Sequence, residues 1–254
     1  MYSPQYLKIS DIELRLSDQA SQYAFNLTSA EVVLQNVLVS SFASGFGTTQ
    51  MLTGFPFDGL SNVTIDNMTI ALDPTVQMQQ LLAFTGTNIT ITNTNLADAN
   101  FSLAAVHIEV GPSSVVLLQN CTFSRLTSPI LSAGLNLRAE SAQVTLDGVT
   151  FSECYANQSS GAFFQVIGTN LTIVNSVFDK CQANNGTVGL YNISNGGAVM
   201  LSVSDNATVL VKDTVFSNNL SAWKGGALYG SIVGSAITWI NVTVAKNTGL
   251  LDDG

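Results

Sequence analysis

A repeat of about 27 residues runs along this chain of 254 residues and limits how it can fold. Nine segments share one position that is Asn or Asp, with Gly148 as the exception, and a large apolar residue three positions later. The first column consists of Asp11, Asn36, Asn67, Asn93, Asn120, Asn175, Asp213 and Asn241. The second consists of Leu14, Val39, Ile70, Leu96, Phe123, Phe151, Phe178, Phe216 and Val244. Nine aligned units indicate a solenoid, in which like residues stack along one axis.

Each unit opens with a short stretch in which apolar and polar residues alternate, as in Val63-Thr64-Ile65. This period of two puts the apolar side chains on one face of a strand. A unit of this length is too short to fold alone, and propeller blades need about 40 residues. No helical periodicity accompanies the strands. The sequence therefore predicts one all-β domain over residues 1–254, a parallel β-helix of about nine coils with three short strands in each.

Two further expectations follow from the Asn/Asp column. An Asn side chain that points into the rod can bond to the equivalent residue in the coils above and below. We expect the eight Asn and Asp residues to form such an inward ladder, which Gly148 interrupts. The longest interval in the column, from 175 to 213, predicts a polar insertion near residues 182–195.

The later coils carry a second motif, F-x-x-N followed by G-G-A, over residues 216–227. The G-G-A part recurs at 196–198, and a weaker version, G-A-F-F, occupies 161–164. Across its whole length the chain resembles the right-handed parallel β-helix repeats of the pectin-lyase-like superfamily. Residues 141–254 resemble more specifically the repeats of polymorphic outer-membrane proteins and related adhesins. The resemblance implies a right-handed solenoid and identifies a type of repeat rather than an activity.

Cys154 and Cys181 take the Asn position of the F-x-x-N motif in consecutive coils. Stacking would bring their Cα atoms to about 4.8 Å, inside the window of roughly 4.4–6.8 Å that a disulfide requires. We therefore predict a disulfide between these two residues, with two buried thiols as the alternative. Cys121 lacks such a partner and is expected to be a buried free thiol.

Thirteen Asn-x-Ser/Thr sequons occur in the chain, where about four or five are expected by chance. Three of them, at Asn67, Asn120 and Asn241, lie in the ladder column and are not expected to carry sugar. We predict N-glycosylation at the other ten: Asn26, Asn62, Asn88, Asn100, Asn157, Asn170, Asn185, Asn192, Asn206 and Asn219. Covalent N-linked glycans would require the eukaryotic secretory pathway, and a disulfide would require an oxidising compartment such as that one. The alternative is that strands rich in Thr create sequons by composition alone.

The charge and the hydropathy of the chain limit the classes of partner that it can bind. Eight basic and 17 acidic residues give a net charge of −9 without a basic cluster, which makes nucleic acid and anionic membrane surfaces poor partners. The mean hydropathy is +0.32, but no run of about 18 apolar residues could insert into a membrane. We recognise no signal peptide and no end caps. The chain is therefore expected to be a fragment of a longer protein, or an uncapped protomer that stacks end to end or laterally.

The pectin-lyase-like superfamily includes polysaccharide lyases and hydrolases, so the acidic residues were considered as catalysts. The best cluster is Glu153, Asp179 and Lys180, which fall close together in the coil register and could serve acid–base chemistry. A charged turn is the simpler interpretation. His107 is interpreted as an outward strand residue beside Glu109, and the hydrolase motifs of the superfamily are not found. We expect no catalytic residue, no cofactor and no metal site.

These features favour a non-enzymatic extracellular glycoprotein that serves as a structural or adhesive rod on a cell surface, or as a subunit of an extracellular filament. Its expected partners are further copies of itself, other matrix or surface proteins, and glycans. Two alternatives stay open. One is a carbohydrate-binding or polysaccharide-degrading pectin-lyase-like module, with Trp223 and Tyr229 as candidate exposed aromatic residues. The other is a bacterial autotransporter-type adhesin passenger.

Overall fold

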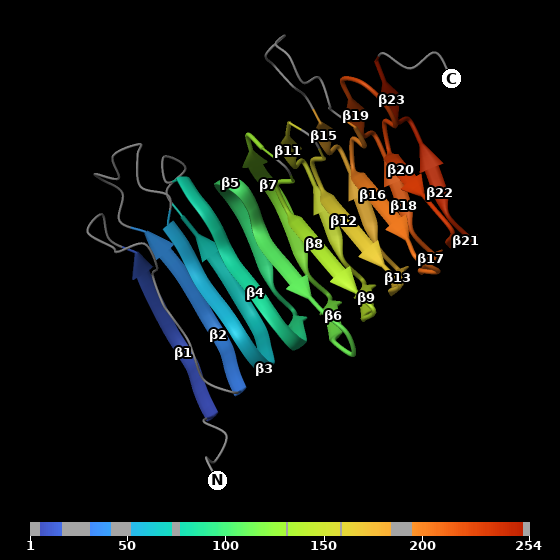
Figure 1. The fold of residues 1–254 in the computed structure, drawn as a ribbon. Helices are drawn as coiled ribbons and strands as arrows, with labels where there is room; N and C mark the ends of the chain where they lie inside the picture. Colours follow the sequence, from blue (N-terminus) through green and yellow to red (C-terminus); the bar gives the residue numbers. More distant parts are fainter. Residues whose placement is uncertain are drawn as a thin grey trace.

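The computed structural model describes residues 6–16, 31–41, 52–72, 77–130, 132–157, 159–183 and 195–250. In these residues every regular element is a β-strand, and 23 strands pair in parallel to form one solenoid (Figure 1). Successive coils follow one another in chain order along the rod. The predicted all-β parallel β-helix is therefore confirmed. None of the described segments forms a helix that could cross a membrane.

The first strands are long, because they continue through a corner of the coil. Strand β3, for example, has 20 residues and passes through the corner at Asn67. The five long strands are β1 (Tyr6–Leu16), β2 (Glu31–Ser41), β3 (Leu52–Ala71), β4 (Gln77–Thr92) and β5 (Asn95–Val110). Shorter strands follow: β6 (Val115–Gln119), β7 (Thr122–Ser128), β8 (Leu135–Glu140), β9 (Gln143–Asp147), β10 (Thr150–Ser152) and β11 (Tyr155–Ala156).

From Leu135 onward each coil consists of four strands rather than the three predicted. The next coils comprise β12 (Ala162–Ile167), β13 (Asn170–Val174), β14 (Val177–Asp179) and β15 (Gln182–Ala183), then β16 (Val199–Ser204), β17 (Thr208–Lys212), β18 (Val215–Ser217) and β19 (Leu220–Ser221). The last coil comprises β20 (Leu228–Ile232), β21 (Ala236–Ile240), β22 (Thr243–Ala245) and β23 (Thr248–Gly249). Seven coils, from Leu52 to Gly249, are described with all their faces, whereas the first two predicted coils are described only by β1 and β2.

The extra division of each coil comes from a second corner. Glu153, Lys180, Asn218 and Lys246 occupy it in successive coils, and all four have positive φ between 53° and 56°. Each of these residues lies at the turn between two short strands, such as β10 and β11, so one predicted strand becomes two. Sequence periodicity did not separate them because charged residues are not typical of this left-handed conformation.

The Asn/Asp column forms the first corner of every coil. Its eight residues have φ between 48° and 57°, and Gly148 has φ 64°. Asn, Asp and Gly adopt this conformation more readily than other residues, which explains why the column is restricted to them. The side chains of this column are solvent-exposed except that of Asp213, which is half-buried. The prediction that the column faces inward is therefore wrong.

A partial ladder nevertheless runs along this exposed corner. Asn36 Nδ2 donates to Asp11 Oδ1 at 2.6 Å, and Asn67 Nδ2 donates to Asn36 Oδ1 at 2.9 Å. Further along, the donors reach a column residue or its preceding neighbour: Asn93 to Asp66, Asn120 to Asn93, Asn175 to Asp147 and Asn241 to Asp213. The predicted contacts between coils thus exist, but they stabilise a surface turn rather than the interior.

Apolar columns fill the interior of the rod. Phe123, Phe151, Phe178 and Phe216 stack face to face, with successive ring centroids 4.6, 5.0 and 4.8 Å apart. Each of the four rings is at most 1% exposed. This spacing equals the distance between parallel strands, since paired residues of adjacent coils share one column. The predicted apolar column is therefore core from Val39 to Phe216, whereas Leu14 in the first coil is half-buried and Val244 in the last coil is 62% exposed.

The G-G-A motif has a steric cause. Gly196 and Gly225 have φ of 71° and 62°, the left-handed conformation that glycine allows. A Cβ atom on Gly197 would lie 2.0 Å from the carbonyl oxygen of Gly226, and one on Gly226 would lie 2.4 Å from the amide nitrogen of Thr248. The motif therefore supplies one turn residue and one residue at which the backbones of neighbouring coils touch.

The predicted insertion near 182–195 lies mainly outside the described residues, at 184–194. Its flanks are described: β15 ends at Ala183, and Asn195 forms an isolated parallel bridge with Lys224. Phe178 still pairs with Phe216 across the long interval, as Phe151 pairs with Phe178. The strand register is therefore the same on both sides of the long interval.

Candidate functional site

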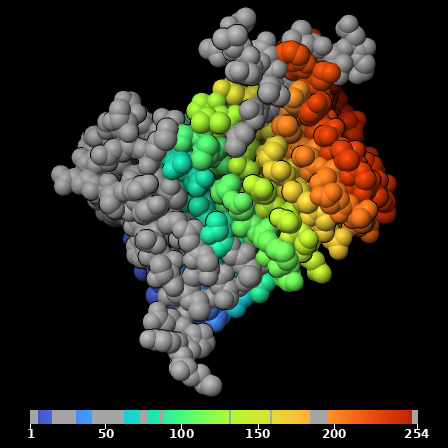
Figure 2. All heavy atoms as spheres, in the orientation of Figure 1, coloured from blue at the N-terminus to red at the C-terminus, as the bar shows by residue number. Residues whose placement is uncertain are grey.

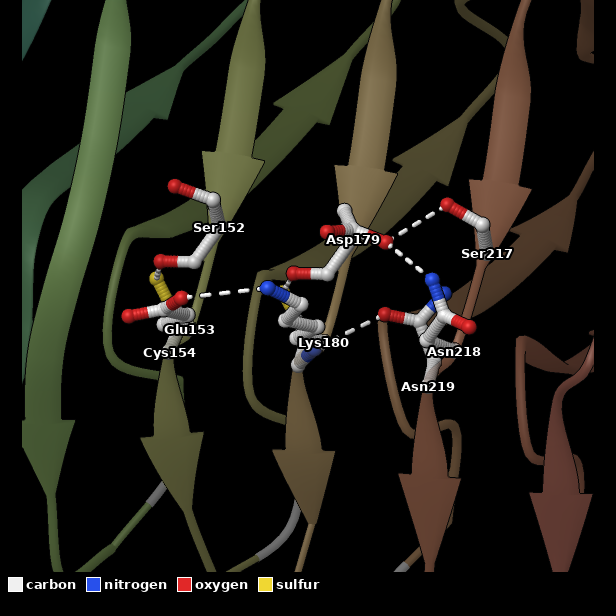
Figure 3. Close-up of polar contacts among 9 residues, drawn as sticks. Ser152, Glu153, Cys154, Asp179, Lys180, Ser217, Asn218 and Asn219 are labelled. Atoms are coloured by element: carbon white, nitrogen blue, oxygen red, sulfur yellow. Dashed lines mark hydrogen bonds and ion pairs between the residues drawn. The ribbon is translucent and has the colours of Figure 1, made fainter.

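The predicted charged cluster lies at the second corner, where two adjacent coils meet (Figure 3). Glu153 follows β10 and Lys180 follows β14, and Lys180 Nζ is 3.5 Å from Glu153 Oε1. Asp179 precedes Lys180 in the chain, and its Oδ1 accepts hydrogen bonds from Ser217 Oγ at 2.6 Å and Asn218 Nδ2 at 2.7 Å. The structure therefore brings the three charged residues together, but Asp179 bonds to the following coil rather than to Glu153.

This cluster has the character of a solvated ion pair. Partial burial alone would raise the pKa of Asp179, but hydrogen bonds from Ser217 and Asn218 and the charge of Lys180 together lower it. A general acid would need a raised pKa. The side chains of Lys180 and Glu153 are 57% and 44% exposed. The arrangement therefore stabilises charges of opposite sign at an exposed turn.

The second corner continues as a column of alternating charge. Arg125 forms a two-pronged ion pair with Asp98 of the preceding coil, with Nε–Oδ1 and Nη2–Oδ2 distances of 2.5 and 2.7 Å. The Arg125 hydrogen bond lowers the pKa of Asp98, against a small opposing effect of burial. Glu153 and Lys180 follow in the next two coils. Negative and positive side chains thus alternate over four coils, which avoids like-charge contacts between stacked corners.

His107 lies on the outward side of β5, as predicted, next to Glu109. Burial lowers the pKa of His107, and the charge of Glu109 opposes this shift only in part. Its Nδ1 atom is buried and has no hydrogen-bond partner among the described residues. The strand pairings set Ala83 and Asn136 against His107 in the two neighbouring coils, and Glu109 is the titratable group that acts on its charge.

The strand pairings place His107 in an outward row with one residue from each following coil. The row continues through Asn136, Phe163, Met200 and Tyr229 on β8, β12, β16 and β20. Asn136 is 7% exposed, and the other four side chains are half-buried. Tyr229 therefore lies on an outward face as predicted, whereas Trp223 lies half-buried in the turn before the last G-G-A motif.

Beside this row runs a second outward row that is polar. Glu109 and Arg138 are paired across β5 and β8, with 3.5 Å between Arg138 Nη1 and Glu109 Oε1. Gln165, Ser202 and Ser231 continue the row. The two rows together form one face of the rod, which presents an imidazole, two aromatic rings and a line of hydrogen-bonding groups.

No cluster of three or more His, Cys, Asp or Glu side chains suitable for a metal ion occurs in the described part of the chain. The expectation of no metal and no cofactor stays a prediction.

An inward amide ladder does exist, at a position that sequence reasoning had assigned to the surface. Asn219 is 1% exposed; its Oδ1 accepts the amide proton of Cys181, and its Nδ2 donates to the carbonyl of Phe178. Asn247 repeats the pattern one coil later, because its Oδ1 accepts from the amide of Asn219 and its Nδ2 donates to the carbonyl of Phe216. The F-x-x-N motif itself was the available signal, since its Asn recurs behind a core Phe.

Cys154 and Cys181 precede Asn219 in the same inward column, and both are buried free thiols. The predicted disulfide is therefore wrong. In parallel strands in register, paired side chains run side by side, so their Cβ atoms are separated by the strand spacing of about 4.8 Å, beyond the roughly 3.5–4.5 Å that a disulfide needs. Burial raises the pKa of Cys181 well above the usual value. Cys121 is a buried free thiol, as predicted.

The structure separates the ten predicted glycosylation sites by exposure. Four are exposed, namely Asn62, Asn88, Asn170 and Asn206. Asn100 and Asn157 are half-buried, and Asn157 Nδ2 donates to the carbonyl of Pro129. Asn219 is buried and both polar atoms of its side chain form hydrogen bonds, so a glycan could be attached to it only by disrupting the core. Asn26, Asn185 and Asn192 lie outside the described residues.

The outward direction of the first corner also changes the prediction for its sequons. Asn67, Asn120 and Asn241 were expected to be inaccessible, but all three are exposed. Burial therefore does not prevent their modification. Their left-handed backbone and their hydrogen bonds to neighbouring coils are the features that a glycan would have to accommodate.

Comparisons with known proteins place these observations in context. A family model described as a right-handed beta helix region matches residues 52–249, the same coils that are described with all their faces. The protein named "Probable autotransporter YfaL" of Escherichia coli (strain K12) is 35% identical over 85 residues, which are 33% of this chain and 6% of that protein. The chain therefore spans a small part of that relative. No solved structure matches the chain.

Proposed function

The chain belongs to the right-handed β-helix family, and on that premise we propose that it is a non-enzymatic structural or adhesive rod, secreted or carried on a cell surface. The observation that carries the proposal is the unbroken interior of the solenoid. Its inward columns are buried from β2 to β18, and its charged side chains form solvated pairs at the corners. Such a rod is stiff, and it presents long outward faces to partners.

The likeness to a protein named as a probable autotransporter supports a surface or secreted location. The net charge of −9 keeps the flanks of such a rod soluble. Under this proposal the partners are surface or matrix components, and neither a metal nor a cofactor takes part.

The test combines adhesion with turnover. Beads coated with the chain are washed over cells and over immobilised matrix proteins and glycans, and retention is compared with beads that carry Phe178→Asp, in which a charge inside the aromatic stack unfolds the rod. Polysaccharide solutions are assayed in parallel for new unsaturated and reducing ends. We expect retention by the folded chain and no turnover. Turnover that disappears in Glu153→Gln with Asp179→Asn would overturn the non-enzymatic function.

Glycosylation decides between a eukaryotic glycoprotein and a bacterial adhesin passenger. The intact mass of the native chain is measured before and after enzymatic release of N-glycans, with peptide mapping. Occupancy at Asn62, Asn88, Asn170 and Asn206, with Asn219 bare, would support the glycoprotein. A bare polypeptide would favour the bacterial passenger, and sugar on Asn219 would contradict the inward ladder.

Carbohydrate binding is a second candidate function, favoured by the outward row that contains Phe163 and Tyr229. Aromatic faces and a neighbouring line of amide, hydroxyl and charged groups are the features that sugar rings contact. Binding of soluble oligosaccharides is measured by calorimetry for the chain and for Phe163→Ala and Tyr229→Ala. Val115→Ala, on a different outward face, is the control. Equal binding by all four proteins would remove this candidate.

A further inference from the structure

Two cysteine side chains lie one above the other inside the rod. Strand β10 pairs with β14 and β11 pairs with β15, so Cys154 and Cys181, which lie between these strands, occupy the same inward position in adjacent coils. Both are 0% exposed. Their coils are one strand spacing apart, as the 5.0 Å between the ring centroids of Phe151 and Phe178 shows. In Figure 2 the colours follow one another in order across the surface, and these yellow coils have neighbours on both sides.

The two sulfur atoms contact backbone groups and the neighbouring cysteine. Cys154 Sγ donates to the carbonyl of Phe123, and Cys181 Sγ donates to the carbonyl of Phe151, each at 3.6 Å. Burial raises the pKa of Cys181, the neighbouring Cys154 thiol raises it further, and the backbone N–H of Cys154 lowers it by a hydrogen bond to the sulfur. A backbone N–H that points at a sulfur stabilises the thiolate form, and such outer contacts support the thiolate ligands of metal ions.

The spacing that excludes a disulfide suits a metal ion between the two sulfur atoms. A disulfide joins sulfur atoms about 2.05 Å apart, whereas parallel side chains of adjacent coils keep them near the strand spacing of about 4.8 Å. A thiolate bond to a first-row metal such as zinc is about 2.3 Å long, so two such bonds in line span about 4.6 Å. Thiolates are soft ligands that select Cu(I), which accepts two ligands in line, whereas structural Zn(II) sites require four.

We propose that Cys154 and Cys181 bind one Cu(I) ion in line between two coils of the rod. On binding, each S–H bond is replaced by an S–Cu bond, two protons are released, and no electron is transferred. The short strands β11 and β15, of two residues each, adjoin the pair, and their local opening admits the ion. The site departs from the expectation of no metal, because two ligands suffice for this geometry. It goes beyond the proposed function and takes no part in adhesion, since it cross-links coils inside the rod.

The test compares the three buried thiols of the chain. Cu(I) is titrated without oxygen into the folded chain, in competition with a coloured Cu(I) chelator, and the released protons are counted. Cys154→Ala removes one proposed ligand, and Cys181→Asn replaces the other by the residue type of Asn219, which follows in the same column. Cys121→Val is the matched control, because it removes a thiol that is equally buried but not stacked on another. Circular dichroism checks each fold, and Cys154→Ser and Cys181→Ser replace any ligand variant that fails to fold.

We expect one Cu(I) ion and two released protons per chain for the wild type and for Cys121→Val. Each ligand variant should bind Cu(I) roughly 100-fold more weakly or worse, because the loss of even an outer contact costs up to about that much. X-ray absorption of the loaded chain should show two sulfur ligands, and Zn(II) should not compete. A folded chain that binds no Cu(I), ligand variants that bind it as tightly as the wild type, or a site that is lost in Cys121→Val would each overturn the proposal. None of these outcomes changes the adhesion assay of the proposed function.

Discussion

The middle of the rod and its last coil use the same column of residues in opposite surroundings. Phe178 has Phe151 on one side and Phe216 on the other, and all three rings are at most 1% exposed. Val244 continues the column with a neighbour on one side only, and it is 62% exposed. The difference shows that an inward side chain of this fold is fully buried only when one coil lies before its own coil and another lies after it.

The largest test of this comparison removes a ring from the middle. Phe178→Ala should lower the free energy of unfolding by about 3–5 kcal/mol, because it deletes two ring contacts and leaves a cavity between buried neighbours. Val244→Ala should cost less than about 1 kcal/mol, because its side chain already faces solvent. Urea unfolding followed by circular dichroism measures both. Equal losses would show that the last coil is covered in solution, contrary to its exposure.

The second test uses the pH dependence of stability. Burial raises the pKa of Cys121 to about 11 from 9.0. Below pH 9 the thiol is neutral in the folded and the unfolded chain, so it contributes in full to the free energy of unfolding. Between pH 9 and 11 only the unfolded chain ionises, so the free energy of unfolding should fall by about 2–3 kcal/mol, at about 1.4 kcal/mol for each unit of pKa shift.

Cys121→Val removes the part of this slope that comes from Cys121, and it introduces the residue type of Val149, which follows in the same column. The buried thiol of Cys181, whose pKa is also raised, keeps its own part of the slope in both proteins. The end of the rod supplies the contrast, since Val242→Cys would place a thiol at the half-buried position of that column in the last coil. Thiolate absorbance should titrate nearer to 9 at position 242 than at 121. The same slope in wild type and Cys121→Val would contradict the assigned cause.

The third test addresses the inward amides. Asn219→Ala should cost about 1–3 kcal/mol, because it leaves the amide of Cys181 and the carbonyl of Phe178 unpaired in the interior. Asn247→Ala should cost less, because Asn247 is half-buried in the last coil. Urea midpoints give both values. Asn241→Gly, at the exposed left-handed corner, is the control and should be nearly neutral.

The smallest effect is expected at the charged corner. Arg125→Ala should change stability only slightly, because Arg125 and Asp98 are 54% and 61% exposed and solvent screens the pair. Lys246→Ala, at the same corner of the last coil, should change it by less than Arg125→Ala. Both are measured at low and high salt. A large, salt-independent loss for Arg125→Ala would contradict the solvated character of this column.

The repeat allowed the fold to be predicted, because the spacing of one column fixes which residues pair between coils. Phe123 and Phe151 are 28 residues apart and Phe151 and Phe178 are 27 apart, and each pair meets in the structure. Hydrophobic residues at equivalent positions can share an interior only by stacking, so periodicity alone placed the core correctly.

The direction of the Asn/Asp column could not be obtained in the same way. Asn is favoured in an inward amide ladder and also at a left-handed turn, so the residue type does not separate the two. Gly148 and Asp213 are the two residues of the column that indicate its outward direction. Glycine gives a ladder nothing to bond with, and an inward carboxylate would be costly to bury, whereas both are ordinary at a turn.

The cysteines and the sequon at Asn219 fail for a related reason. Cα spacing is shared by every pair of stacked residues, and it says nothing about the parallel direction of their Cβ atoms. A sequon is defined by three residue types and does not indicate whether its Asn side chain is buried behind a core ring. Both predictions required side-chain direction, which the repeat period does not supply.

The long interval between β15 and β16 has a consequence for how such a chain can acquire new properties. Phe178 and Phe216 pair directly although 38 residues separate them, whereas 27 separate Phe151 and Phe178. Additional chain between Ala183 and Asn195 thus leaves every ladder of the rod intact. We therefore expect this position to accept a grafted binding peptide or a small folded module without a change in the strand pairing on either side of it.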